Sequence, residues 1–215
     1  MNSIFGVLDP HYIVETLGMV GILTVLFVET GLLIGLILPG DTMLFLAGVA
    51  ASATALQTVG IQLPITILLL SAPLFAISGS QLGHQLGATY GRKLFSRPDS
   101  RIFNQEKVQR TEKWLQKYGV GKALILARFI PVVRTMINPL CGIVGVPAKK
   151  FFIWNFIGGL LWTDGIILAG FLLGEKLSGS VDKYLLPIIG LVFVLSIIPL
   201  ALELIREWRS RKHLS

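Results

Sequence analysis

The stretch ARFIPVVRTMINPLCGIVGV, residues 127–146, decides how this chain folds. It is apolar enough to enter a bilayer, yet Arg128, Pro131, Arg134 and Pro139 lie within twelve residues of one another. Proline interrupts the hydrogen bonds of a helix, and an arginine at the bilayer centre costs at least about 2.5–3.5 kcal/mol on insertion scales. Broken backbone at that depth is stable only beside protein or water. The stretch therefore predicts a segment that enters the membrane, turns at Pro131 and Pro139, and returns to the same side.

The composition of the whole chain is that of an integral membrane protein. Of its 215 residues, 53% are hydrophobic and 14% are charged, whereas soluble domains carry about 25% charged residues. A membrane-spanning helix needs about 20 apolar residues. The longest polar stretch, 91–122, is too short for a soluble domain, so we expect one membrane domain over 1–215. The apolar runs are 16–38, 42–56, 63–90, 123–148, 151–174 and 184–202.

Lysine and arginine are concentrated in a few segments. Residues 1–91 contain neither, 91–122 contains nine of them, and the basic tail 206–215 contains four. Basic loops remain in the cytoplasm. If 123–148 is re-entrant, fifteen basic residues lie inside and two outside; if it spans, the split is eleven to six. The re-entrant arrangement fits better and predicts a cytoplasmic C-terminus. We expect no nucleic-acid binding, because the basic residues flank apolar runs.

The first apolar block has the same organisation. Pro39 and Gly40 supply a turn, and Asp41 stands where the N-cap of the returning helix would be. The predicted fold is all-α, with two facing re-entrant hairpins and about three membrane-spanning helices in an inverted repeat. The expected elements are hairpin one at 20–56, a helix at 63–90, the basic cytoplasmic segment 91–122, hairpin two at 123–148, and helices at 151–174 and 184–205.

Two further features concern the membrane surface. Residues 104–118 place Val108, Thr111, Leu115 and Tyr118 on one stripe, opposite basic residues, with a glycine stop at position 119. This pattern predicts a short interfacial helix on the anionic inner leaflet. Tryptophans near the ends of predicted crossings are interpreted as interface anchors; they are Trp154, Trp162 and Trp208.

Three acids lie within or between apolar runs: Glu29, Asp41 and Asp164. Burial disfavours the charged form of a carboxylate, so each is a candidate proton carrier. The structural alternatives are that Asp41 caps a helix, that Glu29 pairs with an arginine, and that Asp164 lies near the outer boundary in contact with water.

Two arginines are the candidate phosphate ligands. Arg128 and Arg134 would lie about 120° apart on a straight helix, and Pro131 allows the chain to bend and bring them together. Their guanidinium groups suit phosphate oxygens, and Asn138 beside Pro139 is a candidate third donor. The alternative is ion pairing of the arginines with the acids of hairpin one, and both states can occur in turn.

A glycine ladder marks the predicted helix 63–90. Its members recur at every fourth residue, so they form one stripe along which another helix can approach closely. We expect a hairpin or a second copy of the chain to pack against this stripe. His84 borders the stripe, as a polar contact or a proton relay. The ladder consists of Gly79, Gly83, Gly87 and Gly91.

Several quoted motifs together resemble the DedA family of the SNARE-associated Golgi protein superfamily. They are FVETGLLIGLILPGDTMLFLAG (27–48), YGRKL (90–94), the stretch 127–146 and FFIWNFIGGLLW (151–162). The resemblance implies a multi-pass protein of the bacterial inner membrane that translocates lipids, such as undecaprenyl phosphate or phosphatidylethanolamine, with links to the proton-motive force. The family's functional acids correspond to Glu29 and Asp41, and its arginines to Arg128 and Arg134. Family members often carry an acid in the ladder, where this chain has His84.

The sequence therefore favours a proton-linked flippase for an anionic phosphate lipid. A proton-coupled exporter of small cations would use the acids for binding. A membrane scaffold without transport would tolerate Arg128→Lys. The chain has no pattern for a metal, a cofactor or a nucleophile with its base, so we expect no enzyme and no cofactor. The expected partners are membrane lipids, protons and a second copy of the chain.

Overall fold

The computed structural model describes residues 10–32, 40–95 and 105–176, and the regular structure in these ranges is entirely helical. The predicted helix 184–205, the basic tail and Pro39 lie outside the described residues. The helices are α2 (Pro10–Gly31), α3 (Gly40–Val49), α4 (Ala55–Thr58), α5 (Ile65–Phe95), α6 (Gln105–Arg128), α7 (Pro131–Ile143) and α8 (Ala148–Lys176).

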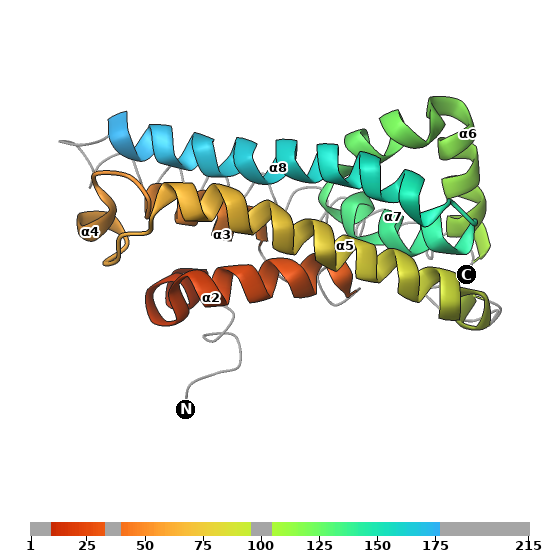
Figure 1. Ribbon diagram of the computed structural model, residues 1–215, viewed down its shortest axis with the longest axis horizontal. Coiled ribbons are helices and arrows are strands. Elements are labelled where there is room, and N and C mark those ends of the chain that lie inside the picture. The colour runs from red at the N-terminus through yellow and green to blue at the C-terminus, as the bar shows by residue number, and fades with distance from the viewer. Residues whose placement is uncertain (1–9, 33–39, 96–104, 177–215) are drawn as a thin grey trace, which may run out of the picture.

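Two long helices form the frame of the molecule. Within α5 the segment Ile65–Gly91, and the whole of α8, are long and apolar enough to cross a membrane. At about 1.5 Å per residue, each exceeds the hydrocarbon core, which is about 30 Å thick. They run side by side in opposite directions (Figure 1). Their outer faces carry exposed apolar side chains, such as Leu70 on α5 and Leu161 on α8.

Two pairs of shorter helices occupy opposite halves of this frame (Figure 1). Helix α2 ends at Gly31 and helix α3 begins at Gly40, and an interruption between Arg128 and Pro131 separates α6 from α7. We call these pairs the acid pair (α2 and α3) and the arginine pair (α6 and α7). Helix α5 packs against α2 and α7, and α8 packs against α3 and α6. Each long helix thus contacts one member of each pair.

Some predicted boundaries differ from the structure. The returning limb expected over 42–56 ends as a helix at Val49 and is followed by the short α4. Pro139 lies inside α7 instead of at a turn. A proline removes the hydrogen bond of its own nitrogen and its ring crowds the preceding turn, and a membrane helix tolerates this when neighbouring helices pack against it. The turn after α7 falls at Gly145, whose φ of 79° belongs to the region that glycine favours.

The glycine ladder of α5 faces both helix pairs. A Cβ on Gly79 would meet the backbone of Phe27 in α2, and one on Gly87 would meet the carbonyl of Pro139 in α7. A Cβ on Gly83 would approach both pairs, at 3.0 Å from the Gly31 carbonyl oxygen and 3.4 Å from Asn138 Cβ. Gly91 lies against Ile143. The stripe therefore seats α2 and α7 one after the other.

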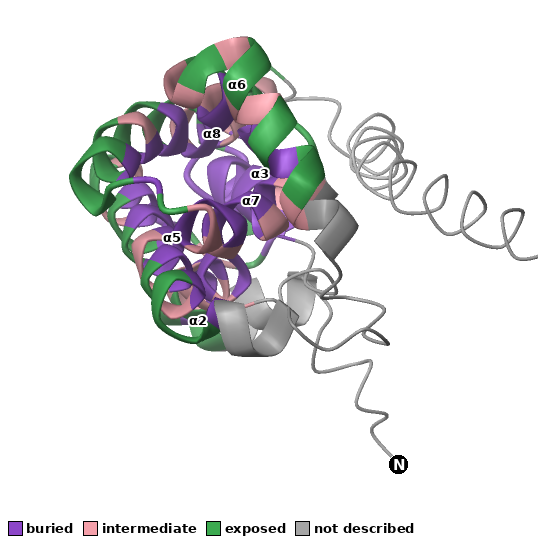
Figure 2. Cartoon of the chain, turned by 90° about the vertical axis from the view of Figure 1, so that its right-hand side faces the viewer, coloured by how far each residue is buried: buried purple, intermediate pink, exposed green. Residues whose placement is uncertain are grey.

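The basic segment forms a kinked helix at one end of the molecule. Helix α6 begins at Gln105 and breaks at Gly119, whose φ is 72°. Before this break Thr111 is buried and Lys113 and Lys117 are exposed, which agrees with the predicted stripe. Seen from this end (Figure 2), the buried residues of α3, α5, α7 and α8 face the interior of the helix assembly.

Candidate functional site

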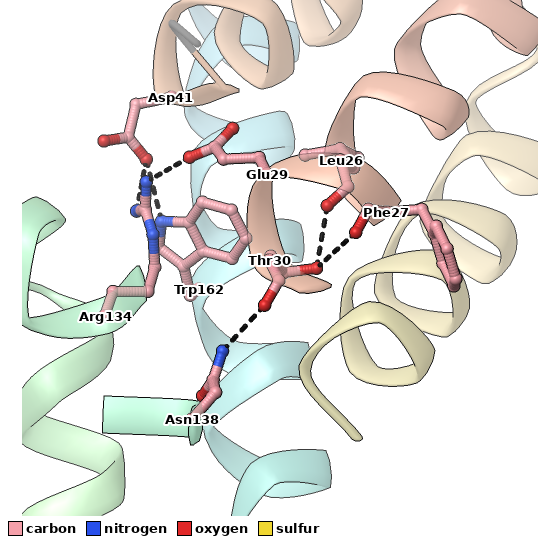
Figure 3. A network of polar contacts seen from close by, with 8 residues as sticks. All are labelled: Leu26, Phe27, Glu29, Thr30, Asp41, Arg134, Asn138 and Trp162. Atoms are coloured by element: carbon pink, nitrogen blue, oxygen red, sulfur yellow. Dashed lines mark hydrogen bonds and ion pairs between the residues drawn. The ribbon is translucent and has the colours of Figure 1, made fainter. Parts of the chain in front are cut away.

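Arg134 connects the two helix pairs at the centre of the fold. It lies near the start of α7, and its guanidinium points toward the acid pair (Figure 3). Its Nη2 donates to Glu29 Oε1 at 2.7 Å, and its Nη1 donates to Asp41 Oδ1 at 2.8 Å. One arginine thus bridges a carboxylate from α2 and a carboxylate from α3. We call Arg134, Glu29 and Asp41 the ion triad.

In the ion triad Glu29 and Arg134 are buried and Asp41 is partly buried, and Trp162 of α8 completes the site. Glu29 is 1% exposed and Arg134 is 4% exposed. The Trp162 indole nitrogen donates to Asp41 Oδ1 at 3.0 Å, and the Arg134 guanidinium lies over the Trp162 ring at 4.2 Å from its centroid. With both acids ionised, the triad carries a formal charge of −1. Trp162 is 3% exposed and lies near the middle of α8, so the prediction that it anchors the membrane interface is wrong.

The two acids occupy opposite ends of helix dipoles. Asp41 lies in the first turn of α3, where the positive end of the dipole stabilises a carboxylate. Glu29 lies in the last turn of α2, where the negative end opposes it. The second carboxylate oxygen of Glu29, Oε2, is buried without a hydrogen-bond partner within the described structure. The charge of Glu29 therefore depends on Arg134 more than that of Asp41 does.

Arg128 has a different environment from Arg134. It is the last residue of α6 and is 2% exposed. Its Nη2 donates to the Ser80 hydroxyl at 2.8 Å and to Asn155 Oδ1. In the part of the chain that the structure describes, no carboxylate pairs with Arg128, and its Nη1 is buried without a hydrogen-bond partner. Pro131 begins α7 and separates this arginine from Arg134, so the two guanidinium groups engage different partners.

Asn138 takes a packing position in the structure. Its Nδ2 donates to the Thr30 carbonyl at 2.9 Å and so joins α7 to α2 (Figure 3). The Thr30 hydroxyl in turn donates to the Leu26 carbonyl at 2.7 Å. The amide that we predicted as a phosphate donor is therefore already engaged between helices.

The other polar candidates lie outside the ion triad. Asp164 is partly exposed, and its carboxylate accepts from the adjacent Thr163 hydroxyl at 3.5 Å. His84 is buried, with Nε2 at 2.9 Å from the Val146 carbonyl oxygen and its ring stacked on Phe151. The structure brings Glu29, Asp41 and Arg134 together and places Asp164 and His84 elsewhere.

Sequence reasoning did not select Ser80, Asn155 or Trp162 as site residues. Asn155 is an amide in the predicted crossing helix 151–174, and a polar residue within a membrane helix is itself a signal of function. Trp162 lies at the midpoint of that crossing, where an interface anchor is not expected. Ser80 carries no comparable signal, because serine is common at helix contacts in membranes.

Comparison with known proteins agrees with this architecture. A VTT domain matches residues 22–172. The chain is 36% identical over 186 residues to Protein DedA of Escherichia coli strain K12, across 86% of this chain and 81% of that protein. The chain belongs to the DedA family.

Other DedA relatives have similar lengths of match. The chain is 33% identical to an uncharacterized membrane protein of Mycobacterium tuberculosis strain H37Rv, over 96% of this chain and 90% of that protein. It is 32% identical to the inner membrane protein YqjA of Escherichia coli strain K12, over 80% of this chain and 78% of that protein. No solved structure matches the chain. These relatives and the two long apolar helices identify this DedA-family chain as a helical membrane protein.

Proposed function

We propose that this protein translocates a lipid with an anionic phosphate headgroup, such as undecaprenyl phosphate, across the bacterial inner membrane. The observation that carries the proposal is the environment of Arg128. A buried guanidinium without a carboxylate is costly, and Arg128 keeps Nη1 without a partner among the described residues. A phosphate oxygen offers the charge and the hydrogen-bond acceptor that this group lacks. The lipid tail would remain in the bilayer while the headgroup occupies the site.

We further propose that both helix pairs are re-entrant hairpins that enter from opposite faces of the membrane. Helix α6 and the start of α8, which carries Lys149 and Lys150, lie at the same end of the molecule (Figure 1). Basic residues favour the cytoplasmic side, so this end and the C-terminus would be cytoplasmic. The packing of each long helix against one member of each pair supports an inverted repeat, in which the substrate site lies where broken helices meet.

The ion triad supplies a route for proton coupling. With both acids ionised it carries a charge of −1 and repels an approaching phosphate. Protonation of one acid would make the triad neutral, and the buried core would then carry the single positive charge of Arg128. Glu29, at the unfavourable end of its helix dipole, is the better proton acceptor. Protonation of Glu29 would weaken its ion pair with Arg134, and the anionic headgroup could then enter the site.

A cation exporter is less well supported by the same geometry. Both acids that would bind a cation already accept hydrogen bonds from Arg134, so a small cation would have to displace a bidentate arginine. A scaffold has no need for a buried arginine without a counterion. The phosphate-lipid proposal accounts for both arginines.

The direct test is transport in liposomes. The protein is reconstituted with a panel of labelled lipids, each assayed with and without a pH gradient, beside a cationic dye. We expect movement of phosphate lipids, loss of this movement in Arg128→Ala, and retention in the matched control Lys117→Ala, which changes an exposed cation. Dye transport without lipid movement would support the exporter, and movement of neither would support the scaffold.

The topology is tested separately with single cysteines. Cys141 is buried and is replaced by serine, and cysteines are placed at Lys117 and Lys149. Both positions should react only with a reagent applied from the cytoplasmic side. Reaction at position 149 from the outside would show that the arginine pair spans the membrane.

A further inference from the structure

Asn155 holds Arg128 through an amide whose two ends are both engaged. Its Oδ1 accepts from Arg128 Nη2, and its Nδ2 donates to the Ile77 carbonyl of α5 at 3.1 Å. Asn155 lies on α8 and is 2% exposed. It therefore joins the end of α6 to both long helices. Because the bond to Ile77 fixes which end of the amide is the oxygen, Asn155 presents an acceptor to Arg128.

Ser80 holds the same guanidinium nitrogen from α5. Its hydroxyl donates to the Ala76 carbonyl at 2.8 Å and accepts from Arg128 Nη2 at 2.8 Å. The hydroxyl hydrogen is thus used within α5, and only its lone pairs face the arginine. Both neutral acceptors converge on Nη2 and leave Nη1 without a partner in the described structure. The orientation of the guanidinium is set from one edge only.

Because Ser80 and Asn155 are neutral, neither of them compensates the positive charge of Arg128. An aspartate has almost the same shape as an asparagine, and this chain places carboxylates at Arg134 in the same core. A carboxylate at position 155 would form a buried ion pair with Arg128 and compete with any incoming anion. The amide accepts the same hydrogen bond without compensating the positive charge. The geometry of Arg128 is therefore maintained while its charge remains available.

We infer that Asn155, assisted by Ser80, is a positioning residue that keeps Arg128 oriented and without a counterion, so that Nη1 can bind a lipid phosphate. This inference rests on the proposed function and deepens it. It assigns different tasks to the two buried arginines. Arg134 responds to the protonation state of the acids, and Arg128 provides the resting positive charge that selects an anionic headgroup.

The test compares Asn155→Asp with the parent and with Thr163→Val. Thr163 lies on the same helix, is fully buried and donates to its own helix at the Gly159 carbonyl. The probes are a labelled short-chain polyprenyl phosphate and the polyprenol with the same chain. We expect Asn155→Asp to raise the apparent KM for the phosphate lipid at least about tenfold. Its thermal stability should fall only modestly, because the bond to the Ile77 carbonyl is lost while an ion pair with Arg128 forms. Thr163→Val should leave KM unchanged.

A rise in KM for the polyprenyl phosphate without a matching rise for the polyprenol separates positioning from a structural role, which would impair the handling of both probes together. If Asn155→Asp fails to reach the membrane, Ser80→Ala supplies the test, since it removes one of the two acceptors at Nη2. We expect it to raise KM about threefold and to reduce the preference for polyprenyl phosphate over polyprenol in competition.

Two results distinguish this inference from the proposed function. A parent that moves phosphate lipids and loses this activity in Arg128→Ala, while Asn155→Asp or Ser80→Ala keeps the parental KM, overturns the inference alone. A parent that moves no phosphate lipid, and whose properties are unchanged in Arg128→Ala, overturns the proposed function and the inference with it.

Discussion

The two buried arginines of this protein lie six residues apart and on either side of one helix break, yet one has acidic partners and the other has neutral ones. Arg134 is held by Glu29 and Asp41, with Trp162 against its guanidinium. Arg128 is held by the neutral groups of Ser80 and Asn155. The comparison teaches that partners, and not the side chain itself, determine what a buried arginine can do. Protonation of Glu29 or Asp41 would change how Arg134 is bound, whereas Arg128 has neutral partners and can bind an anion.

The largest expected effect is that of Arg134→Ala. The change leaves Glu29 and Asp41 buried together without their cation, and removing one partner of a buried ion pair costs about 3–5 kcal/mol. We expect that loss in the free energy of unfolding, measured by denaturation of the purified protein in detergent, together with loss of transport. The triple change Arg134→Ala, Glu29→Gln and Asp41→Asn should recover most of the stability. An unfolding midpoint equal to that of the parent would show that the triad is not a stabilising unit.

Arg128→Ala should separate the two arginines. We expect transport to disappear as fully as in Arg134→Ala, but stability to fall less. The change leaves two unpaired acceptors, on Ser80 and Asn155, which cost about 1–3 kcal/mol, and it also removes an uncompensated buried charge. Arg128→Lys should retain partial transport at most, since lysine lacks the planar fork. Equal losses of stability in the two alanine variants would remove the distinction.

Neutral analogues of Glu29 and Asp41 should change the dependence of transport on the pH gradient more than they change transport itself. Glu29→Gln and Asp41→Asn keep hydrogen-bonding capacity but imitate the protonated acids, so lipid binding should persist while dependence on the pH gradient is lost. The effect should be larger for Glu29→Gln, because Glu29 opposes the dipole of α2. Lipid flux is measured with the gradient imposed and then collapsed. A parental response to the gradient in both variants would exclude these acids as the proton carriers.

The smallest expected effect is that of Trp162→Phe. The ring remains for the guanidinium to lie over, but the indole donor to Asp41 is lost, and one such bond to a charged group contributes about 1.5–3 kcal/mol in a buried site. We expect a loss of stability at the lower end of that range, with transport retained. Trp154→Phe is the matched control, since Trp154 packs in the cluster of α6, α7 and α8. Equal destabilisation by both changes would show that the indole bond to Asp41 contributes nothing specific.

The sequence predicted the features that depend on local chemistry. The start of α7 at Pro131 and the kink at Gly119 follow from the backbone preferences of proline and glycine. The expectation that an arginine pairs with the acids of hairpin one agrees with the ion triad. This expectation follows from the free-energy cost of an isolated charge in the membrane, because an acid and an arginine inside the same membrane domain have few favourable positions other than beside each other.

Other features depend on contacts that a single sequence does not encode locally. The choice of Arg134 over Arg128 as the triad cation depends on where the break between α6 and α7 directs each side chain. Ser80 and Asn155 meet Arg128 only when α5, α6 and α8 are packed, and neutral partners have no charge pattern to reveal them. We expected a turn at Pro139, but a proline need not end a membrane helix against which neighbouring helices pack.

Gly83 has a consequence for movement within the molecule. A Cβ on Gly83 would lie 3.0 Å from the Gly31 carbonyl oxygen of α2 and 3.4 Å from Asn138 Cβ of α7. The rungs of the ladder are four residues apart, about 6 Å along the helix axis, so a slide of α5 by a smaller distance would move Gly83 out of both contacts. The acid pair and the arginine pair thus both contact α5 at the same glycine. A shift of α5 along its own axis would therefore disturb its packing against both pairs at once.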